Sequence, residues 1–301
     1  MEKLKDIPQF SIIIPTYNHA TFIGKTLNSL INQSYENWEA IIINNFSSDN
    51  TIEIVNQFKD PRIKLVNFKN NGIISASRNY GIKLALSKWI CFLDSDDFWY
   101  PKKLESALPY LLKFDIIYHK LDLYDINYRI FGSLKPHSLQ KRQIYKNLFF
   151  NGNTLTNSTV VVKKELIEKV GGFSEDKDIL TVEDYDLWLK ISLITSNFKC
   201  INTSFGGYLV AGQNLSSNVP KMIEKEANLI EKHKSNFNKN EFKELKYRYF
   251  YFWGRRCHLS LKDDNKALEY FRKSKKSHNL KTKIKSIINI WIIVLKKIKN
   301  K

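Results

Sequence analysis

Residues 10–18 read Phe-Ser-Ile-Ile-Ile-Pro-Thr-Tyr-Asn, and this stretch sets the pattern for the first half of the chain. Its apolar run, Phe10–Ile14, is typical of a strand buried on both faces, and we expect Pro15 to end that strand. Apolar side chains then recur at helical spacing, at Ile23, Leu27, Leu30 and Ile31. The stretch therefore predicts a buried strand followed directly by an amphipathic helix.

The same alternation continues as far as residue 119. Further strands are predicted at Glu39–Ile43, Ile63–Phe68, Trp89–Leu93 and Ile116–Tyr118. The helices between them include one that Asp49 is expected to cap and one over 73–87. Near-continuous apolar strands that alternate with helices indicate a mostly parallel sheet covered on both faces. We therefore predict an α/β, Rossmann-like unit, followed by a hairpin across Asp125–Asn127.

Charge divides the chain into two regions. The 301 residues are 43% hydrophobic and carry a net charge of +18. Residues 221–301 hold 23 Lys/Arg and 8 Asp/Glu, whereas residues 1–220 hold 25 and 22. The basic region has a helical pattern, including a helix pair over Tyr249–Ser274. We therefore predict a domain at 1–219 and a basic helical C-terminal region at 220–301.

Cysteine usage and hydropathy indicate a cytoplasmic protein. The three cysteines, Cys91, Cys200 and Cys257, are widely spaced, which argues against a disulfide framework or a structural zinc site. No signal peptide is visible at the N-terminus. The longest apolar stretch, Ile287–Leu295, has nine residues, and spanning a bilayer takes about 20.

Polar residues follow three of the predicted strands, where ligands bind in open α/β sheets. Residues 15–18 follow the first strand, Asn44 and Asn45 the second, and residues 94–97, Asp-Ser-Asp-Asp, the fourth. Arg78, in the third helix, is placed to reach a diphosphate. The sequence contains neither a dinucleotide fingerprint nor a P-loop. This set of side chains suits a nucleoside diphosphate with a bridging metal. His19 is expected to be a surface loop residue.

Two acidic groups leave alternatives open. Three carboxylates in four residues at 94–97 repel one another unless a cation or a raised pKa relieves them. Mg²⁺ or Mn²⁺ would bind there through oxygen ligands, or the stretch is a solvated turn before the helix at Pro101. Residues 183–186, Glu-Asp-Tyr-Asp, are either the favourable acidic start of a helix or a general base beside a sugar site.

Five stretches, taken together, carry a family resemblance. They are Phe10–Asn18, Ser48–Thr51 (Ser-Asp-Asn-Thr), Ser77–Gly81 (Ser-Arg-Asn-Tyr-Gly), Phe92–Asp97 (Phe-Leu-Asp-Ser-Asp-Asp) and Glu183–Trp188 (Glu-Asp-Tyr-Asp-Leu-Trp). In this order and spacing they closely resemble the family 2 glycosyltransferases of the GT-A fold, over roughly residues 8–215. The resemblance implies an inverting enzyme of the bacterial surface-polysaccharide type that uses a nucleoside diphosphate sugar, most often a UDP-sugar.

The resemblance also implies roles for individual residues. The nucleotide-sugar site would comprise Pro15, Thr16, Tyr17, Asn18, Asn45, Arg78, Asp94 and Ser95. Asp96 would bind Mn²⁺ or Mg²⁺ between the two phosphates. Asp184 would be the base that deprotonates the acceptor hydroxyl. Glu183, Asp97 and Trp188 would lie on the acceptor side or support the site.

Two departures from the family pattern bear on specificity. Family members usually carry two aspartates where this chain has Asn44-Asn45. Asn45 can offer a carbonyl oxygen to a uracil N3–H, but without charge assistance, so TDP and GDP also remain open. Many relatives place an Arg and a His where residues 208–211 read Tyr-Leu-Val-Ala. A third protein ligand to the metal is then missing, or it is Gln213 or Asn214.

The C-terminal segment combines charge with an apolar stripe. Residues 271–301 hold 11 Lys/Arg and no Asp or Glu. The stripe consists of Ile284, Ile287, Ile288, Trp291, Leu295 and Ile298, flanked by Lys283, Lys285, Lys296, Lys297 and Lys299. Such a helix either lies in an anionic membrane interface through residues 282–301 or packs on the catalytic domain. Membrane contact would place the enzyme on the inner face of the cell membrane.

The expected activity is elongation of a surface glycan, O-antigen or capsule, on a glycan or lipid-linked acceptor. A basic nucleic-acid-binding protein is an alternative, because the sequence pI is about 9.6. We do not expect a nucleic-acid partner, because the tail has no recognisable binding motif and its lysines flank an apolar stripe. A catalytically degenerate sugar-nucleotide-binding module is a second alternative, and intact Asp94, Asp96 and Asp184 argue against it.

Overall fold

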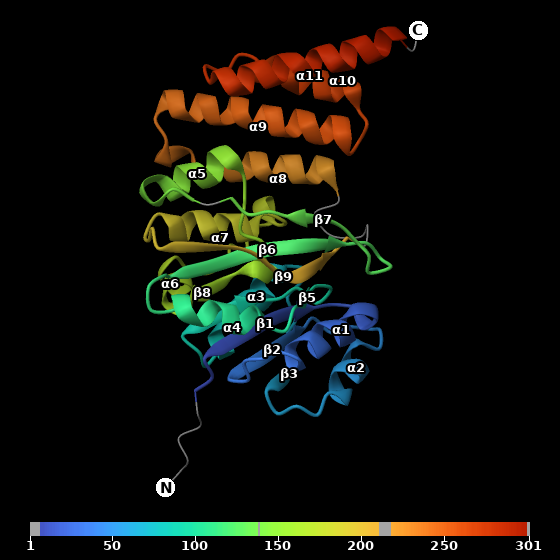
Figure 1. Ribbon diagram of the computed structural model, residues 1–301, viewed down its shortest axis with the longest axis vertical. Coiled ribbons are helices and arrows are strands. Elements are labelled where there is room, and N and C mark those ends of the chain that lie inside the picture. The colour runs from blue at the N-terminus through green and yellow to red at the C-terminus, as the bar shows by residue number, and fades with distance from the viewer. Residues whose placement is uncertain (1–6, 138, 211–217, 300–301) are drawn as a thin grey trace. The chain divides into compact units, whose positions relative to one another are not determined.

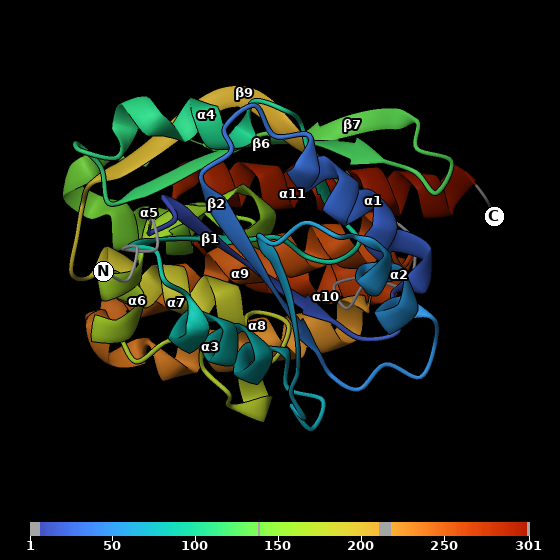
Figure 2. The same ribbon diagram turned by 90° about the horizontal axis from the view of Figure 1, so that it is seen from below.

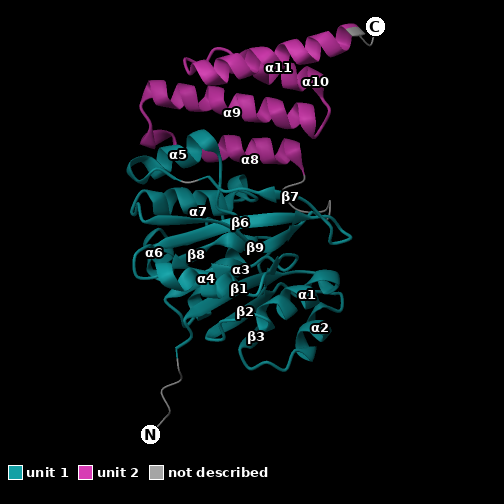
Figure 3. Cartoon of the chain, viewed as in Figure 1, with its two compact units in different colours: residues 1–214 teal, residues 215–301 magenta. Residues whose placement is uncertain are grey.

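The computed structural model describes residues 7–137, 139–210 and 218–299 (Figure 1). The chain divides into two compact units, residues 1–214 and residues 215–301 (Figure 3). The first unit contains the sheet, and the described part of the second is helical. All three cysteines are free.

The first four strands form the parallel part of the sheet. They are β1 (Phe10–Thr16), β2 (Trp38–Asn44), β3 (Ile63–Asn67) and β4 (Trp89–Phe92), in the order β3-β2-β1-β4. The connecting helices are α1 (Ala20–Ile31), α2 (Thr51–Gln57) and α3 (Ile74–Leu84). Figure 2 shows α1 and α2 on one side of β1 and β2 and α3 on the other. The predicted α/β class is confirmed, and it results from the apolar strands β1, β2 and β4, which are buried on both faces.

Pro15 does not end the first strand, and that prediction is wrong. Pro15 still pairs with Ile43 of β2, whereas the last pair between β1 and β4 is Ile13 with Phe92. The Ile13 carbonyl accepts the Leu93 N–H, so alternate residues of β1 face β4, and Pro15 lies beyond the last pair on that side. The missing N–H of Pro15 therefore costs no ladder hydrogen bond.

The sheet continues with mixed strand directions. Its order from β4 onward is β8 (Val161–Lys163), β6 (Ile116–Tyr124), β9 (Phe198–Leu209) and β5 (Phe98–Trp99). The expected hairpin forms where β7 (Ile130–Leu134) pairs with β6, and β6 is longer than predicted. The remaining helices of the unit are α4 (Lys103–Ala107), α5 (Ile144–Asn151), α6 (Lys164–Lys169) and α7 (Glu183–Ser192).

Helix α3 lies unusually close to the sheet at Gly81. A Cβ atom built on Gly81 would lie 2.5 Å from Cγ2 of Ile13 and 3.3 Å from Cγ1 of Ile43. Glycine is therefore required for α3 to approach β1 and β2 this closely. This close approach sets the distance between the sheet and α3, the helix that carries Arg78.

Asp49 joins two helix starts, although it is not the N-cap of α2 as predicted. Asn50 occupies the N-cap position and makes no side-chain capping bond. The Asp49 carboxylate instead accepts the Thr51 N–H at 3.1 Å and the Ala20 N–H at 3.0 Å. The loop after β2 is thereby attached to the start of α1.

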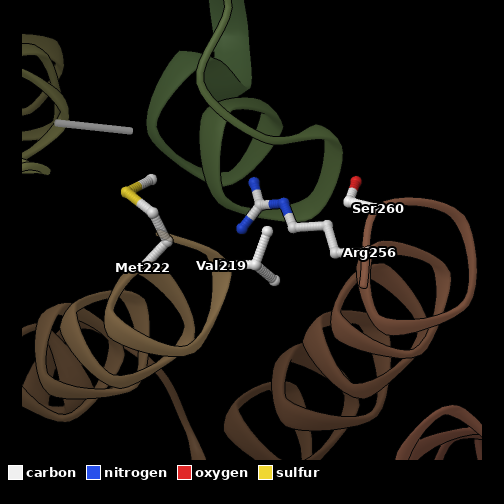
Figure 4. A pocket seen from close by; sticks show the side chains of 4 residues that line it. All are labelled: Val219, Met222, Arg256 and Ser260. Atoms are coloured by element: carbon white, nitrogen blue, oxygen red, sulfur yellow. The ribbon is translucent and has the colours of Figure 1, made fainter. Parts of the chain in front are cut away.

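The second unit consists of α8 (Val219–Lys232), α9 (Lys239–Leu259), α10 (Asp264–Ser274) and α11 (Leu280–Lys299). The helix pair expected over 249–274 forms from α9 and α10, with Gly254 against the ring of Phe271. A pocket of about 230 Å³ is lined by Val219, Met222, Arg256 and Ser260 (Figure 4). No helix within the described parts of the chain has the length and apolarity that a bilayer span requires.

Candidate active site

The carboxyl ends of β1, β2 and β4 meet at one edge of the sheet, because these strands are parallel neighbours. We name residues 94–97, which follow β4, the acidic loop. Asn44 at the end of β2 is fully buried, donates to the Asn67 Oδ1 at 2.7 Å and accepts from Ser47. Asn44 therefore holds the loop after β2 to the end of β3.

The segment Pro15–Asn18 lies at this edge. Thr16 is buried, and its carbonyl accepts the Asn45 N–H at 3.0 Å. Tyr17 exposes 53% of its surface, so its ring is accessible to a ligand. Asn18 has a left-handed φ of 51°, and its Oδ1 accepts the Ser48 N–H at 2.8 Å. The loops after β1 and β2 therefore support each other.

Asn45 uses its carbonyl oxygen within the chain. Its Oδ1 accepts the backbone N–H of Asn70 at 3.0 Å. Only an oxygen can accept from that N–H, so the orientation of the Asn45 amide is fixed. The oxygen has a second lone pair that can still accept from a base, as the sequence suggested, and the Nδ2 group beside it is a donor.

Arg78 is the central cation of the site. Its side chain is buried, with Nη2 donating to the Asp94 Oδ1 at 2.8 Å and Nη1 donating to the Glu183 Oε1 at 2.7 Å. Burial alone would lower the pKa of Arg78, but the charges of Asp94 and Glu183 outweigh burial and raise it. Arg78 therefore joins the acidic loop to the start of α7 across 105 residues of sequence.

The other carboxylates of the acidic loop differ in environment. Asp96 is partly buried, and burial, followed by the charge of Asp94, raises the pKa of Asp96. His19 lies in the loop before α1, as expected, but it is half-buried, and its Nδ1 lies 2.6 Å from the Ser95 Oγ. The charge of His19 acts on Asp96 as well, lowering its pKa. A lone histidine in a loop gave no sequence signal for this contact.

Asp97 is the buried residue that anchors the acidic loop to the rest of the first unit. It is 1% exposed, and its carboxylate accepts from the Ser158 hydroxyl at 2.5 Å and from the Leu209 N–H at 3.3 Å. The Thr26 hydroxyl lies 2.9 Å and 2.8 Å from the carbonyl oxygens of Ser95 and Asp97. Burial, and then the charges of Asp96 and Asp94, raise the pKa of Asp97 well above its usual value. Ser158 and Thr26 are supporting residues that no sequence motif indicated.

The start of α7 brings a second pair of carboxylates to Arg78. Glu183 is 5% exposed, and its Oε2 accepts the N–H of Thr181, a β-branched residue held at a left-handed φ of 85°. Asp184 is partly exposed, and its Oδ1 lies 2.6 Å from the Tyr185 N–H. Burial, followed by the charge of Glu183, raises the pKa of Asp184 to about 7. A carboxyl group with such a pKa suits general base catalysis near neutral pH.

Two other residues of this motif are structural. Trp188 is fully buried, with its ring centroid 6.2 Å from that of Phe92, so it supports the site from the core. Asp186 is also fully buried and forms an ion pair with Lys190 at 3.0 Å. Asp186 therefore contributes to the packing of α7, and its carboxylate is not available to a substrate.

Asn79, beside Arg78, holds the loop that precedes α7. Its Oδ1 accepts the Phe173 N–H at 2.9 Å, and its Nδ2 donates to the Phe173 carbonyl and to Glu175 at 2.9 Å each. Gly171 and Gly172 turn the chain here with φ of 80° and 76°. Two consecutive residues of α3 thus position both the loop at 171–175 and the motif at 183–184.

The donor set fits a hard divalent cation that also binds substrate phosphates. Asp96 forms no ion pair with a cationic side chain of the described segments, and burial, followed by the charge of Asp94, raises its pKa. Within those segments no three His, Cys, Asp or Glu side chains cluster as a complete metal site. Mg²⁺ and Mn²⁺ are commonly held by one or two carboxylates together with phosphate oxygens. The possible further ligands Gln213 and Asn214, and Ala211, lie outside the described residues.

Comparisons with known proteins identify the family of the chain. Residues 11–171 match the family described as "Glycosyl transferase family 2". The chain is 31% identical over 224 residues to the Escherichia coli protein named UDP-Glc:alpha-D-GlcNAc-diphosphoundecaprenol beta-1,3-glucosyltransferase WfgD, covering 73% of this chain and 84% of that one. An uncharacterized glycosyltransferase of Rickettsia typhi is 33% identical, and the match covers 63% of this chain and 60% of that protein.

A solved structure shares the fold. The S. aureus TarS 1–349 structure in complex with UDP-GlcNAc superposes with a TM-score of 0.67 at 17% sequence identity, covering 97% of this chain and 92% of that one. At this identity the likeness shows the fold alone. Together with the family match, it shows a nucleotide-sugar-dependent glycosyltransferase with the GT-A fold. The chain belongs to glycosyltransferase family 2.

Proposed function

We propose that the protein transfers a hexose from a UDP-sugar to a hydroxyl of a lipid-linked glycan, with inversion at the anomeric carbon. Two relatives support this donor and acceptor class. WfgD and WfaP of Escherichia coli, 31% and 28% identical, are both named as UDP-Glc:alpha-D-GlcNAc-diphosphoundecaprenol beta-1,3-glucosyltransferases. Such a reaction would serve the assembly of a surface polysaccharide, O-antigen or capsule.

One observation carries the proposal. The single Arg78 side chain binds a carboxylate of the acidic loop and a carboxylate at the start of α7. The donor-binding residues Asp94 and Asp96 are thereby held in one site with Asp184, the carboxylate whose pKa is raised to about 7. Because both Nη groups of Arg78 are engaged by carboxylates, we assign Arg78 a positioning role in place of direct diphosphate binding.

The chemistry follows from these positions. Asp184 removes the proton from the acceptor hydroxyl, whose oxygen forms a bond to the anomeric carbon from the face opposite the leaving group. The bond between that carbon and the β-phosphate oxygen breaks, and UDP leaves with the electron pair. Asp94 binds the ribose, with Ser95 beside it. Mn²⁺ or Mg²⁺, held by Asp96, would neutralise the departing diphosphate.

The remaining residues define the base and acceptor regions. Pro15, Thr16, Tyr17, Asn18 and Asn45 surround the nucleobase in this proposal. Glu183, Asp97 and Trp188 keep Asp184 and the acidic loop in place. We assign catalysis to residues 1–219. Residues 220–301 form the basic helical C-terminal region and take no part in catalysis in this proposal. A lipid-linked acceptor would require the protein to work at the inner face of the cell membrane.

The test is transfer by the purified full chain. Labelled UDP-glucose, UDP-GlcNAc, TDP-glucose and GDP-mannose would each be incubated with Mn²⁺ and a short-chain GlcNAc-diphosphate lipid, with Asp184→Asn as the control. We expect transfer from a UDP-sugar only, and a β-linked product by NMR coupling constants. Transfer from TDP-glucose or GDP-mannose in place of the UDP-sugars would overturn the donor assignment. An α-linked product would overturn inversion.

A further inference from the structure

Helix α11 has its apolar stripe on the outside of the second unit. Trp291 is 61% exposed, Ile288 50% and Leu295 52%. The other members of the stripe, Ile284, Ile287 and Ile298, are also exposed, and so are Leu280 and Ile292 beside them. Their spacing of three and four residues places them on one face of the helix. A continuous apolar face of this length in water is unfavourable unless another apolar phase covers it.

The opposite face of α11 attaches the helix to the unit, and it is mostly polar. Thr282, Ser286 and Ile293 are buried, each at most 1% exposed. The Ser286 hydroxyl lies 2.7 Å from that of Ser274 in α10, and Arg248 of α9 donates to the Thr282 hydroxyl at 3.1 Å. Hydrogen bonds therefore hold α11 with its polar side inward, the reverse of an ordinary surface helix.

Basic residues border the exposed stripe. Lys281, Lys283, Lys285 and Lys296 are exposed, and residues 271–301 contain no acidic side chain. Lysines beside an apolar face suit a surface whose polar groups are anionic and whose interior is hydrocarbon. The helix does not have the apolar length to cross a bilayer, so it would lie in the plane of the interface.

We propose that the exposed face of α11, residues 280–298, docks the protein on an anionic lipid bilayer. The stripe enters the boundary between headgroups and acyl chains, with Trp291 near its centre, while the lysines contact the headgroup phosphates. Residues 300–301 of the tail lie outside the described residues and are not needed for this surface. Docking depends on the second unit only, so it stands apart from the sugar-transfer reaction.

The test is sedimentation of the full chain with vesicles of phosphatidylglycerol or of phosphatidylcholine. The stripe variant Ile288→Ser/Trp291→Ser/Leu295→Ser should reduce binding to phosphatidylglycerol at least about tenfold. Its unfolding temperature should not change, because all three side chains are exposed. The matched control Leu259→Ser/Leu261→Ser alters exposed apolar residues of the same unit outside α11 and should bind normally. Point variants are preferable to deleting the helix, because a deletion would expose the surface of the second unit that α11 covers.

Four results would overturn the docking proposal. The wild type could remain in the supernatant with both kinds of vesicle. A lower unfolding temperature in the stripe variant would show that the stripe packs on the chain itself. A change from dimer to monomer in that variant would make a second copy the occupant. Retention on DNA without retention on vesicles would make the lysines a nucleic-acid surface. Because sedimentation requires no sugar transfer, an inactive enzyme that still binds vesicles would refute only the proposed reaction.

Discussion

Arg78 and Glu183 form a buried ion pair, with 2.7 Å between Nη1 and Oε1, that joins α3 to the first residue of α7. Removing the cation would leave the carboxylates of Glu183 and Asp94 unpaired. Arg78→Met should therefore lower the free energy of unfolding by about 3–5 kcal/mol, measured by urea denaturation. Arg62→Met, which breaks the Asp60 pair at the surface, should cost about 1 kcal/mol or less. Equal losses in the two variants would contradict the joining role.

Asp184→Asn tests the general base. Proton removal by a positioned carboxylate accelerates reactions by about 10²–10⁴-fold, so turnover should fall by that factor. The affinity for UDP, measured by calorimetry, should change little, because the base faces the acceptor in the proposed reaction. Asp186→Asn is unsuitable as a control because Asp186 is buried and paired with Lys190. Glu165→Gln, an exposed change in α6, serves instead. Near-normal turnover in Asp184→Asn would refute the assignment.

The pH dependence of turnover should report Asp184. Its pKa is raised to about 7 by burial and then by the charge of Glu183. The base is active when deprotonated, so kcat should rise with pH and level off above about 7. Glu183→Gln removes a negative neighbour and frees Arg78, and both changes lower the pKa of Asp184. The rising limb should therefore move to lower pH in that variant. If the rising part of the pH profile stays at the same pH in Glu183→Gln, the group that it reports is not Asp184.

The raised pKa of Asp184 also makes the free energy of unfolding depend on pH. A carboxyl whose pKa is raised on folding favours the folded state when protonated, and this contribution is lost as pH rises through about 7. Asn at position 184 is neutral at every pH. Asp184→Asn should therefore be at least as stable as the parent above that pH, as thermal unfolding at several pH values would show. A variant that is less stable there would indicate that the ionised carboxylate makes a favourable contact.

Nucleotide binding should require both a divalent metal and Asp96. Mn²⁺ with UDP should raise the unfolding temperature of the parent chain, and EDTA should abolish the increase. Asp96→Asn should remove the effect of the metal while the chain stays folded. Asp97→Asn is the contrasting variant: it weakens the bonds to Ser158 and Leu209 and should lower the unfolding temperature even without ligand. Undiminished stabilisation by UDP in EDTA would contradict the role of the metal.

Asn45→Asp tests how the base is recognised. The Asp carboxylate can still accept the Asn70 N–H and adds a second, charged acceptor where the Nδ2 donor now lies. A uracil N3–H would gain a charge-assisted hydrogen bond, so the affinity for UDP should rise by up to about tenfold. Calorimetry with UDP, TDP and GDP provides the comparison. A marked loss of UDP affinity would show that the amide donates to the base.

The sequence predicted the parallel strands and the acidic loop correctly because long apolar runs and the stretch Asp94–Asp97 are local signals. It did not indicate Ser158, which reaches Asp97 across 61 residues from a 3₁₀ turn with no apolar periodicity. It did not indicate that Asp186 is buried, because a buried ion pair within a helix has the same local sequence as an exposed one. For α11, periodicity identified the residues that share a face. The hydrogen bonds at Thr282 and Ser286 determine which face is attached.

The close approach of α3 to the sheet at Gly81 predicts that a substitution far from any substrate would make the active site sensitive to heat. A methyl group there would push α3 away from Ile13, and Arg78, one turn earlier on the same helix, would move with it. The guanidinium would then bind Asp94 and Glu183 with poorer geometry, so these two ion pairs would break at a lower temperature. Gly81→Ala should therefore behave as a conditional allele, active in cells grown cool and inactive in warm ones. It would control the proposed sugar transfer by temperature without replacing Asp94, Asp96 or Asp184.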